Sequence, residues 1–316
     1  MAVSYNKLCK ILIDRKMRRA DLRKATEIAP NIPNIMTKMC KDEPVQRRFK
    51  LVKLLYFFDD KIKPLTMRGK YYCKPEETGV LQEGVSCIRE YDVNFWFYSK
   101  DRKTIAFDSG HINYKNIDDE FKKIDVTPEN VKHLFLTHLD TDHAGGIDKS
   151  GCNIFPNAKV YMGEAENKYM TREIRRKGIF YNCVKIIEGW IPIKGNVIFE
   201  VEGIKVEAIP VPGHTVGHTV YIVDDKIMIS GDCLAINESG GYAFFDFFTQ
   251  NPSKNKESLL NLKHNLEGRK LSYVCTGHSG IHAYSEKVFA HIDSSAVFGK
   301  TTPFHKDGEY NPFEKR

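Results

Sequence analysis

Residues 137–146 read Thr-His-Leu-Asp-Thr-Asp-His-Ala-Gly-Gly and follow an apolar run that predicts a strand at 132–137. Four potential metal ligands fall within six residues of this stretch: His138, Asp140, Asp142 and His143. Imidazole and carboxylate groups bind zinc-type metals, and catalytic sites of this kind leave one position open for water. Gly145 and Gly146 let the backbone bend tightly after the ligands. The stretch therefore indicates a catalytic metal site, with a chance cluster as the alternative.

Three segments downstream carry the same residue types, each after a predicted strand. They read Pro-Gly-His-Thr-Val-Gly-His at 212–218, Gly-Asp at 231–232 and Thr-Gly-His-Ser at 276–279. From His143, the successive steps to His214, Asp232 and His278 are 71, 18 and 46 residues. Because each candidate stands at the carboxyl end of a strand, we expect all of them to converge on one edge of the fold.

Hydrophobic periodicity predicts strands and helices in alternation over most of the chain. Strands are predicted at 93–99, 104–108, 132–137, 158–162, 196–211, 218–231 and 271–276, the sixth with an Asp-Asp turn at 224–225. Helices are predicted at 115–124, 164–176, 253–266 and 285–292. Mixed sheets with helices outside them indicate an α/β sandwich.

Composition restricts the class of protein. The chain has 316 residues, 41% of them hydrophobic and 28% charged, which is ordinary for a globular protein. It contains no apolar run of the roughly eighteen residues that a membrane span needs, and its first residues lack the apolar core of a signal peptide. Its eight cysteines are scattered, without a Cys-x-x-Cys pair. We therefore expect a cytoplasmic protein with reduced thiols.

Charge is distributed unevenly along the chain. Residues 1–70 hold 18 Lys and Arg against 7 Asp and Glu, whereas the remainder holds 30 against 34. The spacing of apolar residues predicts short helices in this basic part, at 5–17, 21–27, 31–40 and 47–58. A basic surface attracts nucleic acid or an acidic membrane, and a solvated basic helix pair without a partner is the alternative.

The combined pattern of residues 78–295 resembles the metallo-β-lactamase superfamily of hydrolases. That family carries His-x-His-x-Asp-His, followed by a His, an Asp and a final His at about the spacings found here. Its upstream signature appears as a strand around Asn94 and the Phe-Asp-Ser-Gly turn at 107–110. The segment at 212–218 is typical of the glyoxalase and lactonase-like branches. The resemblance implies an αβ/βα sandwich of two sheets with helices outside.

The resemblance also implies a binuclear site for two divalent metal ions, with zinc expected. The implied ligands are His138, Asp140 and His214 for the first ion, Asp142, His143 and His278 for the second, and Asp232 as the bridge between them. In such a site a bridging hydroxide attacks a carbonyl or phosphoryl centre, and the metals stabilise the oxyanion that forms. Asp142 would also be a catalytic residue that steers the hydroxide or passes on its proton.

Asp140 departs from the family pattern, which has its second His at this position. The form His-x-Asp-x-Asp-His resembles variants of the family, including the hydrolase domain of DNA-uptake competence proteins. A carboxylate still binds metal, but it adds negative charge and makes the site harder, so iron or manganese gains on zinc. The alternative is an ordinary loop carboxylate beside a single occupied metal position.

Four further residues near these motifs have candidate roles. Asp108 is expected to orient a ligand His from behind, with a turn-capping Asp as the alternative. Tyr242 is a candidate for the wall of a substrate pocket, with a plain core aromatic as the alternative. Cys233 is expected to be a small buried side chain, and His218 a structural residue rather than a ligand.

Residues 5–42 resemble the first three helices of a Cro-type helix-turn-helix DNA-binding domain. The segments that carry this resemblance are Asn-Lys-Leu at 6–8, Ala-Asp-Leu-Arg-Lys-Ala-Thr at 20–26 and Lys-Asp-Glu-Pro at 41–44. Glu27, Ala29 and Pro33 depart from that domain at its turn, its helix cap and its recognition helix. DNA is therefore a candidate partner of the basic end. Alternatively, the helix at 47–58 packs on the hydrolase or pairs two chains.

The sequence thus predicts four parts: a helix-turn-helix-like segment at 1–45, a basic helix and linker at 46–75, a hydrolase domain at 76–300 and a tail at 301–316. The leading function is hydrolysis of a small ester, lactone, thioester or related substrate. A phosphodiesterase or nuclease, and a DNA-binding regulator with a ligand-sensing domain, are the alternatives. The ligand set favours an enzyme, because a sensor need not retain it, but the fold alone does not choose the substrate.

Overall fold

Strands in two large sheets and one small sheet form the framework of the described part of this computed structural model. The structure describes residues 74–90, 92–111, 117–149, 153–176, 184–186, 188–246 and 248–296. The chain divides into two units, Met1–Pro64 and Leu65–Arg316, and every described residue belongs to the second. The predicted helices between residues 5 and 58, with their helix-turn-helix resemblance, and the predicted tail at 301–316 lie outside the described residues.

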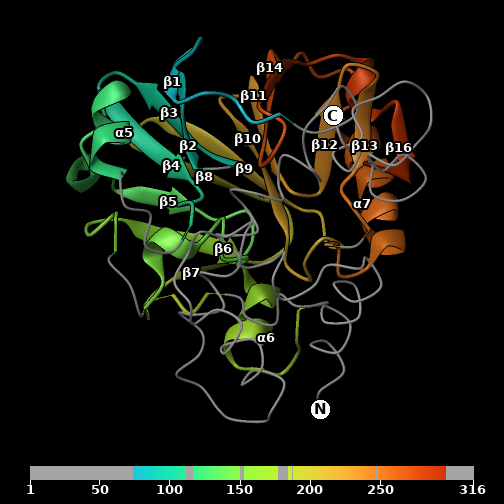
Figure 1. Cartoon of the computed structure of the whole chain (residues 1–316), viewed down its shortest axis with the longest axis horizontal. Helices are drawn as coiled ribbons and strands as arrows, with labels where there is room; N and C mark the ends of the chain where they lie inside the picture. The colour runs from blue at the N-terminus through green and yellow to red at the C-terminus, as the bar shows by residue number, and fades with distance from the viewer. Residues whose placement is uncertain are drawn as a thin grey trace, which may run out of the picture. The chain divides into compact units, whose positions relative to one another are not determined.

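The first sheet contains seven strands in chain order (Figure 1). They are β1 (Gly79–Val80), β2 (Val85–Glu90), β3 (Val93–Lys100), β4 (Lys103–Phe107), β5 (His133–Phe135), β6 (Lys159–Gly163) and β7 (Ile191–Ile193). Strands β1 to β4 pair antiparallel, whereas β4 to β7 pair in parallel. Because parallel neighbours end at the same edge of a sheet, the segments that follow β4 and β5 emerge side by side.

The second sheet has the order β15-β14-β11-β10-β9-β8. Its strands are β8 (Val197–Val201), β9 (Ile204–Pro210), β10 (Thr219–Val223), β11 (Ile227–Gly231), β14 (Tyr273–Thr276) and β15 (Ile281–Ala283). Strands β11 and β14 pair in parallel, so the residues after Gly231 and Thr276 also emerge at one edge. The third sheet joins β12 (Leu234–Asn237), β13 (Gly240–Ala243) and β16 (His291–Ser295).

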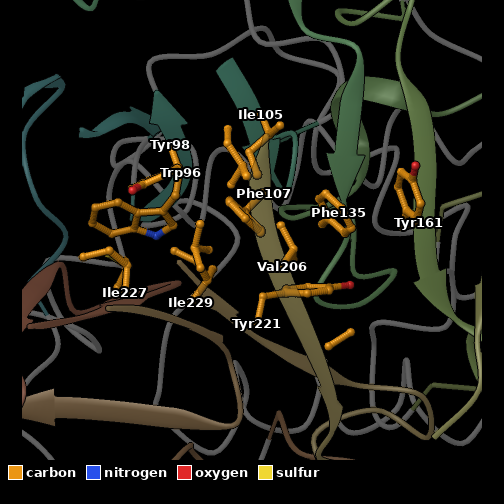
Figure 2. Close-up of a cluster of buried hydrophobic side chains, with 14 of the residues drawn as sticks. Trp96, Tyr98, Ile105, Phe107, Phe135, Tyr161, Val206, Tyr221, Ile227 and Ile229 are labelled. Atoms are coloured by element: carbon orange, nitrogen blue, oxygen red, sulfur yellow. The ribbon is translucent and has the colours of Figure 1, made fainter. Parts of the chain in front are cut away.

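Alternating apolar side chains fill the space between the two large sheets (Figure 2). In β3, Trp96 and Tyr98 belong to this cluster, while the intervening Phe95 and Phe97 belong to a second cluster. The second sheet contributes Val206, Ala208, Tyr221, Ile227 and Ile229 to the first cluster. Successive side chains of a strand point to opposite faces, so the second cluster covers the other face of the first sheet.

Helices cover the outer faces of the sheets (Figure 1). Helix α5 (Ile117–Lys123) contributes Phe121 to the cluster outside the first sheet. Helix α7 (Pro252–Asn265) contributes Leu259 and Leu262 to the cluster outside the second sheet. These layers confirm the expected αβ/βα sandwich. Within the described ranges, every helix falls short of the length and apolar character that a membrane crossing needs.

Two predicted helices are partly wrong. At 164–176 the structure has only η3 (Glu164–Glu166) and α6 (Asn167–Met170) before the chain turns. At 285–292 it has η4 (Glu286–Phe289) and then β16, because pairing with β13 supplies backbone hydrogen bonds to that strand. The buried Val288 and Ile292 stand four residues apart, which mimics the helical period.

The long predicted strands at 196–211 and 218–231 are each a hairpin of two strands. Asp224 and Asp225 form the expected turn of the second hairpin, with positive φ angles of 47° and 57°. Asp tolerates this left-handed conformation better than most residues. The pattern misses several short elements, among them β2, β12, β13, η1 (Pro128–Asn130) and η2 (Gly145–Ile147).

Glu166 links two of the loops in which the sequence predicts metal-binding histidines. Its carboxylate is buried and accepts hydrogen bonds from the backbone N–H of Leu139, at 2.8 Å, and of Gly217, at 2.8 Å. Burial raises the pKa of this carboxyl, and the two N–H donors oppose the rise. The side chain therefore fixes the loop after β5 against the loop after β9.

We expect Phe135→Ala to lower the free energy of unfolding by about 3–5 kcal/mol, because it leaves a cavity between the sheets. Phe135 is fully buried, and its ring centroid lies 4.4 Å from that of Tyr161 and 5.6 Å from that of Phe107. Urea unfolding followed by circular dichroism measures the change. Ile198→Ala, at a side chain that is 54% exposed, is the control and should stay within about 0.5 kcal/mol. Equal shifts in the two variants would contradict the assigned core.

We expect Glu166→Ala to cost about 2–5 kcal/mol, because it leaves two buried N–H donors without an acceptor. The matched control is Glu164→Ala, two residues earlier, where the carboxylate is half-exposed and forms an ion pair with the exposed Lys194. An exposed pair of this kind contributes about 0–1 kcal/mol. Thermal unfolding compares the two variants. A Glu166→Ala protein as stable as the control would show that the two loops do not need this link.

Candidate functional site

The seven ligand candidates from the sequence meet at one edge of the sandwich. Three groups of side chains each bring ligand atoms within 4.8 Å of one another: His138, Asp140 and His214; His138, His143 and Asp232; Asp142, His143 and His278. The first and third groups are the two sets of three that the resemblance implies. They come from the loops after β5, β9, β11 and β14, as the position of each candidate at the end of a strand predicts.

Asp108 stands behind this cluster, at the end of β4. Its Oδ1 accepts the backbone N–H of Thr137 at 2.7 Å, and its Oδ2 accepts the Thr137 hydroxyl at 2.7 Å. The same Oδ2 lies 2.8 Å from His143 Nδ1. Asp108 has a positive φ of 62°, a conformation that costs energy unless contacts such as these hold it.

The bonds of Asp108 also determine how two histidines present their rings. Since a carboxylate only accepts, His143 Nδ1 is the donor and leaves the Nε2 lone pair for another partner. The Thr137 hydroxyl donates its hydrogen bond to Asp108, so its oxygen accepts a hydrogen bond from His138 Nδ1 at 2.9 Å. His138 therefore also presents an Nε2 lone pair to the centre of the cluster.

His278 is fixed in the same sense by a backbone group. Its Nδ1 donates to the carbonyl oxygen of Asp92 at 2.7 Å, which leaves Nε2 as the lone-pair atom. That Nε2 lies 3.1 Å from Asp232 Oδ2 and 3.4 Å from Asp142 Oδ2. Asp232 Oδ1 in turn lies 3.2 Å from His143 Nε2, so Asp232 faces both histidines.

The atoms of this cluster fit a metal ion. His138 Nε2, His143 Nε2 and Asp232 Oδ1 are buried and make no hydrogen bond of regular geometry among the described residues, although His143 Nε2 lies 3.2 Å from Asp232 Oδ1. Unpaired buried polar atoms are costly, so three of them in one group indicate a ligand that they share. Gly277 keeps the space beside them open, because a Cβ there would lie 2.1 Å from Asp232 Oδ1 and 2.7 Å from His143 Cε1.

The electrostatics of the cluster also fit a cation. Burial lowers the pKa of His143, but the carboxylates of Asp232, Asp142 and Asp108 outweigh it and hold the pKa well above its usual value. Burial likewise lowers the pKa of His278, and Asp232 is the largest of the charges that raise it well above normal. The carboxylates thus attract a proton or another positive charge into this space.

Asp140 lies beside His138 and His214 and is also bound by Arg176, which sequence reasoning missed. Arg176 is buried, and its Nε donates to Asp140 Oδ1 at 2.6 Å while its Nη2 donates to Oδ2 at 2.5 Å. Burial raises the pKa of Asp140, but the charge and hydrogen bonds of Arg176 outweigh it and hold that pKa well below its usual value. Burial also lowers the pKa of His214, to about 4, so its ring is neutral near pH 7.

Phe244 is a second residue of the site that the sequence did not indicate. Its ring stacks on His278, with centroids 5.4 Å apart, and meets His214 edge-on at 5.3 Å. The predicted pocket residue Tyr242 instead stacks on His291 in the third sheet, and its hydroxyl lies 2.7 Å from Ser239 Oγ. Those contacts describe a packed sheet aromatic, and a pocket role for Tyr242 stays a prediction.

Two other expectations agree with the structure. His218 Nε2 accepts the backbone N–H of Asp232 at 3.1 Å, which uses the lone pair that a metal would need. Cys233 is buried, its thiol donates to Ser230 O at 3.2 Å, and burial raises its pKa. The three cysteines that the structure describes, Cys87, Cys233 and Cys275, are free thiols.

Part of the chain is similar in sequence to known proteins. An atrochrysone carboxyl ACP thioesterase of Aspergillus aculeatus is 31% identical over 114 residues, which are 34% of this chain and 30% of that protein. A hydroxyacylglutathione hydrolase of Shewanella halifaxensis is 26% identical over 122 residues, 37% of this chain and 41% of that protein. The chain therefore matches less than half the length of these relatives.

The fold has a counterpart among solved structures. A metallo-beta-lactamase family protein of Thermus thermophilus aligns with a TM-score of 0.51 and 17% identity, over 67% of this chain and 78% of that one. The sequence profile of the metallo-beta-lactamase superfamily matches residues 88–278, more than half of the chain and every ligand candidate. The chain belongs to the metallo-beta-lactamase superfamily.

Proposed function

We propose that this chain is a metal-dependent hydrolase of a small ester, thioester or lactone. The observation that carries the proposal is the convergence of three buried ligand atoms, on His138, His143 and Asp232, which lie within 4.8 Å of one another and make no hydrogen bond of regular geometry among the described residues. An apolar or purely structural cluster would not leave such atoms unpaired, because each costs about 1–3 kcal/mol.

Two positions for divalent ions are proposed at this site. The Asp140 position consists of His138, Asp140 and His214, and the Asp142 position consists of Asp142, His143 and His278, with Asp232 shared between them. Zinc suits the imidazole ligands, and Asp140 adds the hard oxygen donor that iron or manganese prefers. The histidine orientations support both positions, because the Nδ1 atoms of His138, His143 and His278 are bonded on the side away from the cluster.

When bound, such ions supply an activated water and polarise the carbonyl of the substrate. The protein residues orient and shield this chemistry. Asp142 is partly exposed, at 26% of its side chain, and is the most exposed of the three carboxylates proposed as ligands. Burial raises the pKa of Asp142, but His143 and His278 outweigh it and lower that pKa. The group is therefore a carboxylate near pH 7, and it can orient an attacking water by accepting a hydrogen bond from it.

The names of the relatives support an acyl substrate. One is named a thioesterase and the other a hydroxyacylglutathione hydrolase, so both names describe release of an acyl group from a carrier. For this chain we propose an acyl thioester or a similar activated ester. Phe244 is buried and packs on His278 and His214, so the surroundings of the proposed metal positions are apolar on this side.

Removal of metal should abolish hydrolysis. We expect the chelated, metal-free protein to lose at least about 100-fold in rate on its best substrate, because water then loses the activation that lowers its pKa toward about 7. Added Zn²⁺, Mn²⁺ or Fe²⁺ should restore the rate. The measurement is turnover on a panel of a thioester, a lactone, an ester and a phosphodiester.

Circular dichroism of the metal-free protein is the control that separates loss of metal from loss of fold. Full turnover without metal would end the metal proposal. Activity on the phosphodiester alone would keep the metal proposal and overturn the substrate class.

Asp108→Asn should weaken metal binding by about 10–100-fold, because the partner behind a ligand His fixes its tautomer and orientation. The amide must turn one NH₂ donor toward the N–H of Thr137 or toward His143, where the structure has only donors. The matched control is Asp101→Asn, since Asp101 also has a positive φ, of 49°, but is exposed in the turn between β3 and β4. Metal affinity is read from competition with a chelator. If Asp108→Asn binds metal with unchanged affinity, Asp108 only caps a turn and does not orient the ligand histidine.

A further inference from the structure

Arg176 is fixed in the site by groups other than its carboxylate partner. Its Nη1 donates to the backbone oxygen of His214 at 3.0 Å, and its Nη2 donates to the backbone oxygen of Phe248 at 2.9 Å. Only 3% of the residue is exposed. The guanidinium is therefore held in place by the loop after β9 and by the segment before α7, as well as by Asp140.

The guanidinium lies where a metal ion of the Asp140 position would find two of its ligand atoms. Nη2 is 2.5 Å from Asp140 Oδ2 and 3.2 Å from His214 Nε2, and those two atoms are 3.3 Å apart. A guanidinium has only donors and keeps its positive charge at any ordinary pH. The single lone pair of His214 Nε2 cannot face both Arg176 and a metal ion. Arg176 and a metal ion thus compete for the same two atoms.

The Asp142 position is built differently. His143 Nε2 lies 3.2 Å from Asp232 Oδ1, and His278 Nε2 lies 3.1 Å from Asp232 Oδ2 and 3.4 Å from Asp142 Oδ2. These nitrogen atoms face carboxylate oxygens and not an arginine. A metal ion at this position gains the carboxylates without displacing an arginine.

We propose that Arg176 makes the two metal positions unequal: a divalent ion fills the Asp142 position first, and at the Asp140 position the guanidinium is a built-in cation that a second ion must displace. This inference rests on the proposed function, from which it takes the two metal positions. Arg176 is a positioning residue, because it acts through Asp140 and His214 and does not itself bind the metal.

The test is a titration of the metal-free, full-length protein with Zn²⁺ in competition with a chromophoric chelator. The native chain should take up one equivalent tightly and a second at least about 10–100-fold more weakly. Arg176→Met should strengthen the second equivalent by about the same factor and leave the first unchanged. The control is Arg175→Met, at the exposed neighbouring arginine, which should reproduce the native curve.

Two variants of proposed ligands show at which position the first, tightly bound Zn²⁺ ion lies. His278→Ala should remove the tight equivalent, whereas His214→Ala should leave it in place. The reverse result would overturn the order of filling.

A double variant keeps the test valid if Arg176→Met does not fold. Arg176→Met leaves the Asp140 carboxylate without its partner, and breaking a buried pair in this way can unfold a protein. The double variant Arg176→Met with Asp140→His removes both charges and supplies an imidazole ligand. It should bind two equivalents with affinities within about tenfold of each other, and a thermal melt confirms that it is folded.

Failure of the inference and failure of the proposed function give different results. A native chain that binds no Zn²⁺ overturns the proposed metal site. A native chain that binds two equivalents with equal affinity, and keeps that curve in Arg176→Met, retains the metal site and overturns the role of Arg176. A folded double variant with the same unequal curve as the native chain overturns that role as well.

Discussion

The carboxylate of Asp108 is the interaction on which the site depends. It closes the gap between the ends of β4 and β5 by accepting both the N–H and the hydroxyl of Thr137. Through His143 directly, and through the Thr137 hydroxyl to His138, it decides which nitrogen of each ring faces the cluster. Its left-handed backbone, at φ 62°, aims the side chain inward from the end of a strand. One acidic group at the end of a strand thus orients the rings of both His138 and His143 toward the cluster.

Charge within the site is balanced in two different ways. Near Asp140, a buried arginine supplies the positive charge from the protein itself. Near Asp142 and Asp232, the ion pairs formed among the described residues are with histidine rings. These carboxylates raise the pKa values of His143 and His278, although burial lowers them. A carboxylate in place of the usual histidine therefore does not simply add negative charge to the site, because Arg176 compensates it.

The sequence predicts the sandwich and the meeting of the ligands well, because both follow from local pattern. Strand ends carry the ligands, and parallel pairing brings strand ends together whatever the loops contain. Arg176 could not be predicted, since it follows Arg175 in a polar run and only the path of the chain after α6 buries one and exposes the other. The strand β16 was mistaken for helix because its pairing with β13 is a long-range contact that spacing does not reveal.

Gly277 restricts how this site can change over evolutionary time. A methyl group there would overlap Asp232 and touch His143, so even alanine collides with the centre of the cluster. Gly79, by contrast, has nothing within 4 Å of its would-be Cβ. Any larger residue at position 277 would therefore require Asp232 to move, so the sequence of the loop after β14 and the geometry of the cluster can change only together.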